Sequence, residues 1–138
     1  MKKKSITVET VVSAPIEQVW KSWLEPKHIE QWNAASTDWH TPKAVNEVRE
    51  GGRFVYTMAA KDGSVSFDFC GTFVEIVEHQ KIVTRLDDER MVWVTFEEHN
   101  KGVQVIETFE IENENTEELQ RLGWQAILDN FKKHVESL

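Results

Sequence analysis

The residues that offer acid–base chemistry begin with Asp38, Trp39 and His40, which are consecutive in the chain. Histidine titrates near neutral pH, and a carboxylate beside it can hold its proton, so this run is a candidate for general acid–base catalysis. Adjacency in sequence does not bring two side chains into contact, and an ordinary loop histidine is the alternative interpretation. A catalytic role therefore requires further polar groups to converge on His40.

Three further charged residues are candidates because strand-like alternation would turn them toward the interior. In the segment Val103–Phe109 every second residue is apolar except Glu107, which would share the apolar face. Glu75 stands in the same relation to Phe73, and Arg85 could supply an ion-pair partner. A buried carboxylate is costly unless it is paired or protonated. The alternatives are a bulge that turns these groups to solvent and a structural ion pair at the sheet end.

Aromatic side chains are the other candidate for a site, since the chain has six Trp and seven Phe against a single Tyr. Large rings bury much apolar surface, and the indole N–H also offers a hydrogen bond, which suits a core or a ligand site. Plain core packing is the alternative for each Trp. The six are Trp20, Trp23, Trp32, Trp39, Trp93 and Trp124.

Other chemistries have no support in the sequence. Cys70 lies in the strand-like run FDFCGTF, where a thiol is more often inert packing than a reactive thiolate. The histidines are dispersed and there is no second cysteine, so we expect no metal site and no cofactor. Gly51-Gly52 lacks the Lys-Ser/Thr ending of a phosphate-binding loop.

The charge and the apolar runs bound the class of partner. The chain of 138 residues carries 24 acidic and 16 basic residues, a formal net charge of −8 that repels phosphate backbones, so we expect no nucleic acid partner. No run approaches the roughly 20 apolar residues of a membrane-spanning helix, so we expect no membrane insertion. The single cysteine and the lack of a signal-like apolar stretch predict a cytoplasmic protein. Without repeats or linkers, residues 1–138 are expected to form one domain.

The elements that must position these residues follow from periodicity. Alternation over Ile6–Val12 predicts a strand, and Ser13-Ala14-Pro15 then starts a helix with an apolar stripe over Ile16–Leu24. Pro26 is suited to open a second short helix. Strand-like runs from Ala44 to Ile111, broken by turn residues, predict an antiparallel meander of about six strands.

The end of the chain changes to helical periodicity. Asn115 and Glu118 resemble a capping box at its start. A helix of about 20 residues is roughly 30 Å long, enough to cross a small sheet. The sequence thus predicts an α+β fold, a curved antiparallel sheet of about seven strands with two short helices and a long C-terminal helix. The apolar stripe of that last helix is Trp124, Ile127, Leu128, Phe131, Val135 and Leu138.

Two consecutive strands of the meander carry the face that this helix should cover. Asp62-Gly63 between them predicts a hairpin with a type I′ turn. Arg53 and Asp68 lie on the other face of the two strands, which can be exposed to water. The covered side chains are expected to be Phe54, Tyr56 and Met58 on one strand and Phe67, Phe69 and Phe73 on the next.

A resemblance to a known family rests on four segments: VVSAPIEQVWKSWLEPKHIEQWN, VREGGRFVYTMAAKDG, GTFVEIVEHQKIV and LGWQAILDNFKKHVE. In order and spacing they resemble bacterial proteins grouped with the activator of the ninety-kilodalton heat-shock ATPase. That family is similar to the START and birch-pollen-allergen (SRPBCC) superfamily, which implies a helix-grip fold with a deep cavity between the last helix and the sheet. Trp32 and Trp39 flank a loop that would then lie near the mouth of the cavity.

Three functions remain open from the sequence. Binding of an apolar or aromatic small molecule, lipid-like or polyketide-like, is favoured by the aromatic inward faces and the missing catalytic constellation. A cyclase or hydrolase would need the polar candidates to converge on one point. A chaperone-associated stress-response module, with a chaperone or a second copy of the chain as partner, follows from the family alone. No catalytic residue is assigned, and the residues expected at the ligand site are Trp32, Trp39, His40, Phe54, Tyr56, Met58, Phe67, Phe69, Phe73, Glu75, Arg85, Trp93, Glu107, Trp124 and Leu128.

Overall fold

The computed structural model describes residues 4–138 of the chain. Within this range seven strands and three helices follow one another. Their order is β1 (Ser5–Val12), α1 (Ile16–Leu24), α2 (Pro26–Trp32), β2 (Trp39–Asn46), β3 (Arg53–Ala60), β4 (Ser66–Val77), β5 (Lys81–Leu86), β6 (Met91–His99), β7 (Gly102–Glu110) and α3 (Glu117–Glu136).

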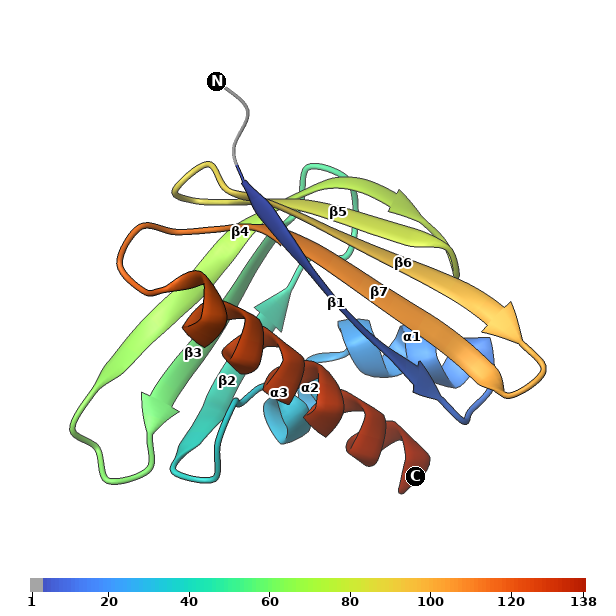
Figure 1. Cartoon of the computed structure of the whole chain (residues 1–138), viewed down its shortest axis with the longest axis horizontal. Coiled ribbons are helices and arrows are strands. Elements are labelled where there is room, and N and C mark those ends of the chain that lie inside the picture. Colours follow the sequence, from blue (N-terminus) through green and yellow to red (C-terminus); the bar gives the residue numbers. More distant parts are fainter. Residues whose placement is uncertain (1–3) are drawn as a thin grey trace.

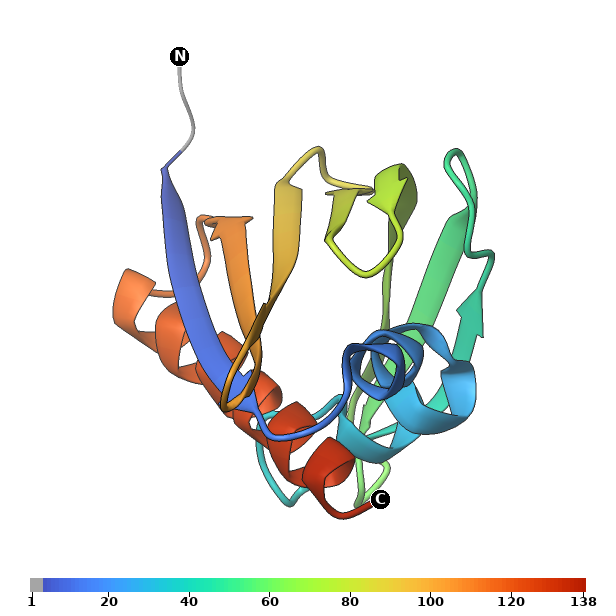
Figure 2. The ribbon, with the colours of Figure 1, turned by 90° about the vertical axis from the view of Figure 1, so that its right-hand side faces the viewer.

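The described strands form one antiparallel sheet in the order β1-β7-β6-β5-β4-β3-β2. Strands β2 to β7 are a meander, and β1 adds to the edge beside β7. Figure 2 shows the sheet curled into an arch with β1 and β2 at its two ends. Helix α3 crosses the open side of the arch and packs on β1, while α2 lies against β2 (Figure 1). The predicted helix-grip arrangement is confirmed.

The helices begin where local chemistry favours a start. Pro26 occupies the first turn of α2, where its missing N–H costs no hydrogen bond. Thr116 caps α3, because its side-chain oxygen accepts a hydrogen bond from the Leu119 backbone N–H at 3.1 Å. The predicted capping residue, Asn115, is therefore wrong by one position. The apolar stripe of α3 is buried or half-buried except at Leu138, which lies beyond the end of the helix and is 59% exposed.

The strand boundaries differ from the prediction in two places. Strand β2 begins at Trp39, earlier than the expected Ala44, so Trp39 belongs to the sheet. The hairpin between β3 and β4 forms as predicted, but only Gly63 has a positive φ, so its turn is not type I′. Asp62 instead accepts a hydrogen bond from the Ser64 backbone N–H at 2.8 Å, which holds the longer loop together.

Gly71 lets β4 lie close to its neighbours within the curved sheet. A Cβ at this position would lie 2.5 Å from the Arg85 carbonyl oxygen and 2.9 Å from the ring of Phe54. Only a residue without a side chain fits between them, and the Phe54 ring fills the space above it. A register shift between Phe73 and Glu75 follows in the same strand and changes which side chains face inward.

Candidate functional site

A cavity of about 790 Å³ lies between the concave face of the sheet and the three helices. This volume falls within the range of about 300–1,000 Å³ that is typical of small-molecule sites, and most of the lining is apolar. The cavity is the space expected from the fold. The residues proposed from the sequence that line it are Trp32, Trp39, Phe54, Tyr56, Met58, Phe67, Phe69, Phe73, Glu107 and Trp124.

The sheet side of the cavity is a continuous aromatic wall on β3 and β4. Phe54 lies with its ring centre 5.1 Å from that of Tyr56 and 5.5 Å from that of Phe73. Tyr56 is stacked on Phe69 at 6.5 Å across the two strands. Burial in this wall raises the pKa of the Tyr56 hydroxyl, so it stays protonated at physiological pH.

The helix side of the cavity is closed by two tryptophans that pack on a buried phenylalanine. Trp23 and Trp32 have ring centres 5.1 Å apart, and each meets the edge of Phe131 on α3 at 4.9 Å. The indole N–H of Trp32 donates to the Ser22 carbonyl oxygen at 3.0 Å. Trp32 therefore offers a ligand its ring but not its hydrogen-bond donor.

Trp124 joins the two sides of the cavity. Its ring is stacked on Phe109 of β7 with centres 4.0 Å apart and planes 9° from parallel. Its other neighbour is Phe69 of β4, whose ring lies 6.2 Å away at a steep angle. One side chain of α3 thus contacts two distant strands of the arch.

The large apolar side chains of Phe67, Leu119 and Trp39 are partly open to solvent and mark the mouth of the cavity. Phe67 is 48% exposed and Leu119 is 59% exposed, and both line the cavity. Trp39 is half-buried, and its ring centre lies 6.0 Å from that of Phe67. A ligand entering here would meet apolar side chains first.

Glu107 is the buried acid of the cavity. It lines the cavity from β7 and is 8% exposed. Burial raises the pKa of its carboxyl to about 8, because the charged form loses its hydration. The inward orientation predicted from alternation is correct.

Two further polar residues of the lining, Arg90 and Gln120, are held by hydrogen bonds within the protein. Arg90 donates from Nε to Asp88 at 2.7 Å. The side chain of Gln120 donates to the carbonyl oxygens of Glu112 and Asn115 and accepts from the Glu112 backbone N–H. Gln120 thereby fixes the segment that leads from β7 into α3.

The structure does not form the acid–base pair suggested for Asp38 and His40. His40 is exposed on β2, pairs with Ala59 and does not line the cavity. The Asp38 carboxylate accepts a hydrogen bond from the Ser36 hydroxyl at 2.6 Å, which lowers its pKa. The expectation that His40 faces the site is wrong, because alternation along β2 turns Trp39 inward and His40 outward.

Glu75 and Arg85 are also wrong as inward residues. The register shift after Phe73 places Glu75 opposite Val83 on the outer face, where it forms an ion pair with Lys81 at 3.0 Å. Arg85 is exposed, because its neighbour Thr84 takes the cavity side of β5. The predicted pair between Glu107 and Arg85 is absent from the described residues, since the two lie on opposite faces of the sheet.

Trp93 and Leu128, which were also expected at the ligand site, do not line the cavity. Trp93 lies between Val92 and Val94, which both line the cavity, so its ring falls on the outer face. Leu128 is fully buried in the core beneath α3 and does not reach the cavity. Both are packing residues.

Several residues that line the cavity were not predicted from the sequence. Thr84 could have been found, because it alternates with Ile82 on the inward face of β5. Asn33, Arg90 and Glu112 lie outside the regular elements, so no periodicity indicates their direction.

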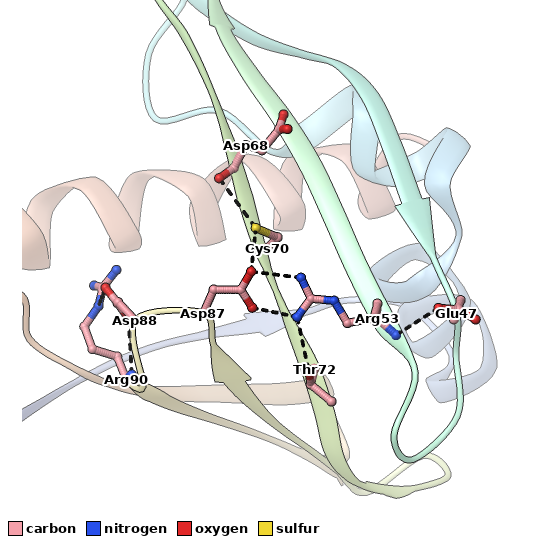
Figure 3. Close-up of polar contacts among 8 residues, drawn as sticks. All are labelled: Glu47, Arg53, Asp68, Cys70, Thr72, Asp87, Asp88 and Arg90. Carbon is pink, nitrogen blue, oxygen red and sulfur yellow. Dashed lines mark hydrogen bonds and ion pairs between the residues drawn. The ribbon is translucent and has the colours of Figure 1, made fainter.

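The outer face of the sheet carries a separate polar network around Cys70 (Figure 3). Arg53 makes two hydrogen bonds to Asp87, at 2.6 and 2.8 Å, and a third to Thr72. The ion pair lowers the pKa of Asp87 to about 2. The Cys70 thiol donates to Asp87 at 3.2 Å, and this bond raises the pKa of the thiol. A thiol held in its protonated form is a poor nucleophile. The role of the network is structural: it joins β3 and β4 to the turn that follows β5.

Two features are absent from residues 4–138. No group of three or more His, Cys, Asp or Glu side chains there could hold a metal ion. No helix in the same range is long and apolar enough to cross a membrane.

Comparisons with known proteins agree with this architecture. The family described as "Activator of Hsp90 ATPase homolog 1-like protein" matches residues 13–136. The solution structure of an AHSA1-like protein from Aeromonas hydrophila is 45% identical, covers 97% of this chain and 93% of its own, and superimposes with a TM-score of 0.91. No curated protein gives a significant match.

Two further solved structures extend the likeness. A protein from Cytophaga hutchinsonii is 46% identical over 96% of this chain and 92% of its own, with a TM-score of 0.83. A protein from Chromobacterium violaceum, 24% identical over 96% of this chain and 98% of its own, has a TM-score of 0.86 and shows the shared fold alone.

Proposed function

The chain belongs to the family of Activator of Hsp90 ATPase homolog 1-like proteins, and from this premise we propose that it binds an apolar, aromatic or acyl small molecule between the sheet and α3. The observation that carries the proposal is the cavity of about 790 Å³ with its aromatic wall. Apolar pockets of this size with few polar groups are the usual form of small-molecule sites.

The lining of α3 supports the same proposal. Gly123 lies in the interior of this helix, where glycine costs roughly 1 kcal/mol relative to alanine. It lines the cavity, and a Cβ added there would meet no atom within 4 Å. The helix thus leaves open space where a side chain would have stabilised it.

The enzyme alternative loses its support. It required His40, Glu75, Arg85 and Glu107 to converge, and only Glu107 lines the cavity. A single carboxyl without a second polar group in contact does not make an acid–base pair.

Binding is tested by titrating purified protein with a panel of aromatic and acyl compounds while following Trp emission and the melting temperature. A ligand that binds only the folded state stabilises it, by about 2.7 kcal/mol at one hundred times its Kd. Trp124 and Trp32 line the cavity, so the emission change should saturate together with the thermal shift.

Gly123→Leu is the matched test of location. The new side chain should occupy part of the cavity and weaken the ligand-induced shift, while the melting temperature without ligand stays at or above that of the wild type. Asp68→Asn on the outer face is the control and should bind normally. A full panel without either signal would overturn the proposal, and equal binding by Gly123→Leu would move the site elsewhere.

A further inference from the structure

Glu107 is surrounded by apolar side chains on the concave face of the sheet. Along β7 its neighbours on the same face are Val105 and Phe109. Across the ladder it stands opposite Val8 of β1 and Val94 of β6. All four neighbours are buried, and Glu107 itself is 8% exposed.

The carboxyl of Glu107 has no hydrogen-bond or ion-pair partner among residues 4–138, unlike the other charged groups of the cavity. Arg90 is held by Asp88 at 2.7 Å. The Glu112 carboxylate accepts from the backbone N–H groups of Glu114 and Asn115.

The elements facing Glu107 bring no cation to it. The side chains of α1, α2 and α3 that line the cavity are all uncharged. The other titratable groups of the lining are the protonated hydroxyl of Tyr56, the Arg90 guanidinium and the Glu112 carboxylate. Of the two cavity groups with full charge, Arg90 is neutralised by its own partner. Glu107 therefore faces an apolar space in which no described cation would balance the charge of its carboxylate.

A carboxyl in such surroundings keeps its proton, because ionisation would place an unpaired charge in a medium of low polarity. Burial accordingly raises the pKa of Glu107 to about 8. A neutral carboxyl presents one O–H donor, and that donor is unused in a cavity that otherwise offers mainly aromatic surface.

We infer that Glu107 is the polar anchor of the site, and that the ligand is an uncharged apolar molecule whose carbonyl or similar oxygen accepts a hydrogen bond from the Glu107 carboxyl. The inference rests on the proposed function. An anionic ligand is excluded from this position, because it would meet a carboxyl and no free cation among the described lining residues.

The experiment compares two probes of the same shape. Acetylnaphthalene carries a carbonyl oxygen where isopropenylnaphthalene carries a methylene group, so only the ketone can accept a hydrogen bond. By calorimetry at pH 6, the wild-type protein should bind the ketone about tenfold more tightly than the hydrocarbon. Above the pKa of about 8, this preference should decline towards equal binding of the two probes, because the donor is lost.

Two variants separate the hydrogen bond from the shape of the cavity. Glu107→Leu removes the donor at similar volume and should bind both probes equally. Glu107→Gln keeps an N–H donor that does not titrate, so the preference for the ketone should persist from pH 6 to pH 9. The comparison of the two probes in the wild-type protein across pH needs no variant to fold.

The outcomes distinguish the anchor from the cavity. Equal binding of both probes by the wild-type protein, weakened in Gly123→Leu, would overturn the anchor and leave the proposed function standing. Tighter binding of naphthylethylamine than of the ketone at pH 6, abolished by Glu107→Leu, would overturn it in favour of a carboxylate that pairs with cations. Failure of every probe and of the wider panel would overturn both proposals.

Discussion

Glu107→Gln should flatten the dependence of stability on pH. Between the ordinary glutamate pKa of about 4.5 and the raised value of about 8, the folded protein holds a proton that the unfolded chain has released. Unfolding then releases this proton, so the contribution of Glu107 to stability is fully present below pH 4.5 and is lost as pH rises through about 8. Glutamine does not titrate and removes this decline.

The size of the effect follows from the difference between the pKa of Glu107 in the unfolded chain and in the folded protein. Each pH unit costs about 1.4 kcal/mol while the two states differ by one proton. The loss is about 2 kcal/mol by pH 6, about 4 kcal/mol at pH 8 and about 5 kcal/mol above pH 9. Because a domain of this size is stable by roughly 5–15 kcal/mol, the loss is a large fraction of the total.

The assay is urea unfolding from pH 5 to pH 9, followed by Trp emission and circular dichroism. With a slope of about 2 kcal/mol per molar urea, the midpoints of Glu107→Gln and wild type should separate by about 2 M across the range. Glu98→Gln, the same change at an exposed position of β6, is the control and should run parallel to the wild type. Parallel curves for Glu107→Gln would refute the claim that its carboxyl is buried without a partner.

Three further predictions concern packing and the helix contacts. Trp124→Ala should lower the free energy of unfolding by about 3 kcal/mol in urea, because it removes the ring stacked on Phe109; a loss below 1 kcal/mol would contradict that stacking. Gly71→Ala should lower it by about 2 kcal/mol or more, because the new methyl meets a carbonyl oxygen at 2.5 Å; an unchanged urea midpoint would count against that close approach. His134 bonds to His28 at 2.8 Å, and burial lowers its pKa, so stability present above pH 6.5 should fall on acidification; His134→Gln should lose this dependence, as thermal melts at pH 5 and 7 would reveal.

Much of the candidate site could be predicted from the alternation of side chains along single strands. Phe54, Tyr56 and Met58 were expected on one face, and all three line the cavity. Glu107 was expected inward on the same grounds and is buried. These positions depend only on the two-residue period of a strand and on an apolar majority that must be buried.

The errors lie where a local pattern does not define the face. Glu75 follows Phe73 by two residues, yet the register shift between them turns it outward. Trp93 and Arg85 stand in strands whose two faces both carry apolar side chains, so the pattern cannot choose between them. His40 was proposed from its neighbour in sequence, which carries no information about distance.

The sequence by itself determined the order of the elements and which side chains share a face of each strand, because these follow from periodicities within a few residues. It also indicated the family, through the resemblance of four segments. Only the tertiary structure decided which face of β5 and β6 is concave, where the ladder shifts, and that no cation of the described part of the chain pairs with Glu107. Those features arise from pairing between strands distant in the chain and from α3 closing over them, as when Trp124 meets both Phe109 and Phe69. Among residues 4–138 the carboxyl of Glu107 is unpartnered, because its neighbours along β7 and across the ladder to β1 and β6 are apolar.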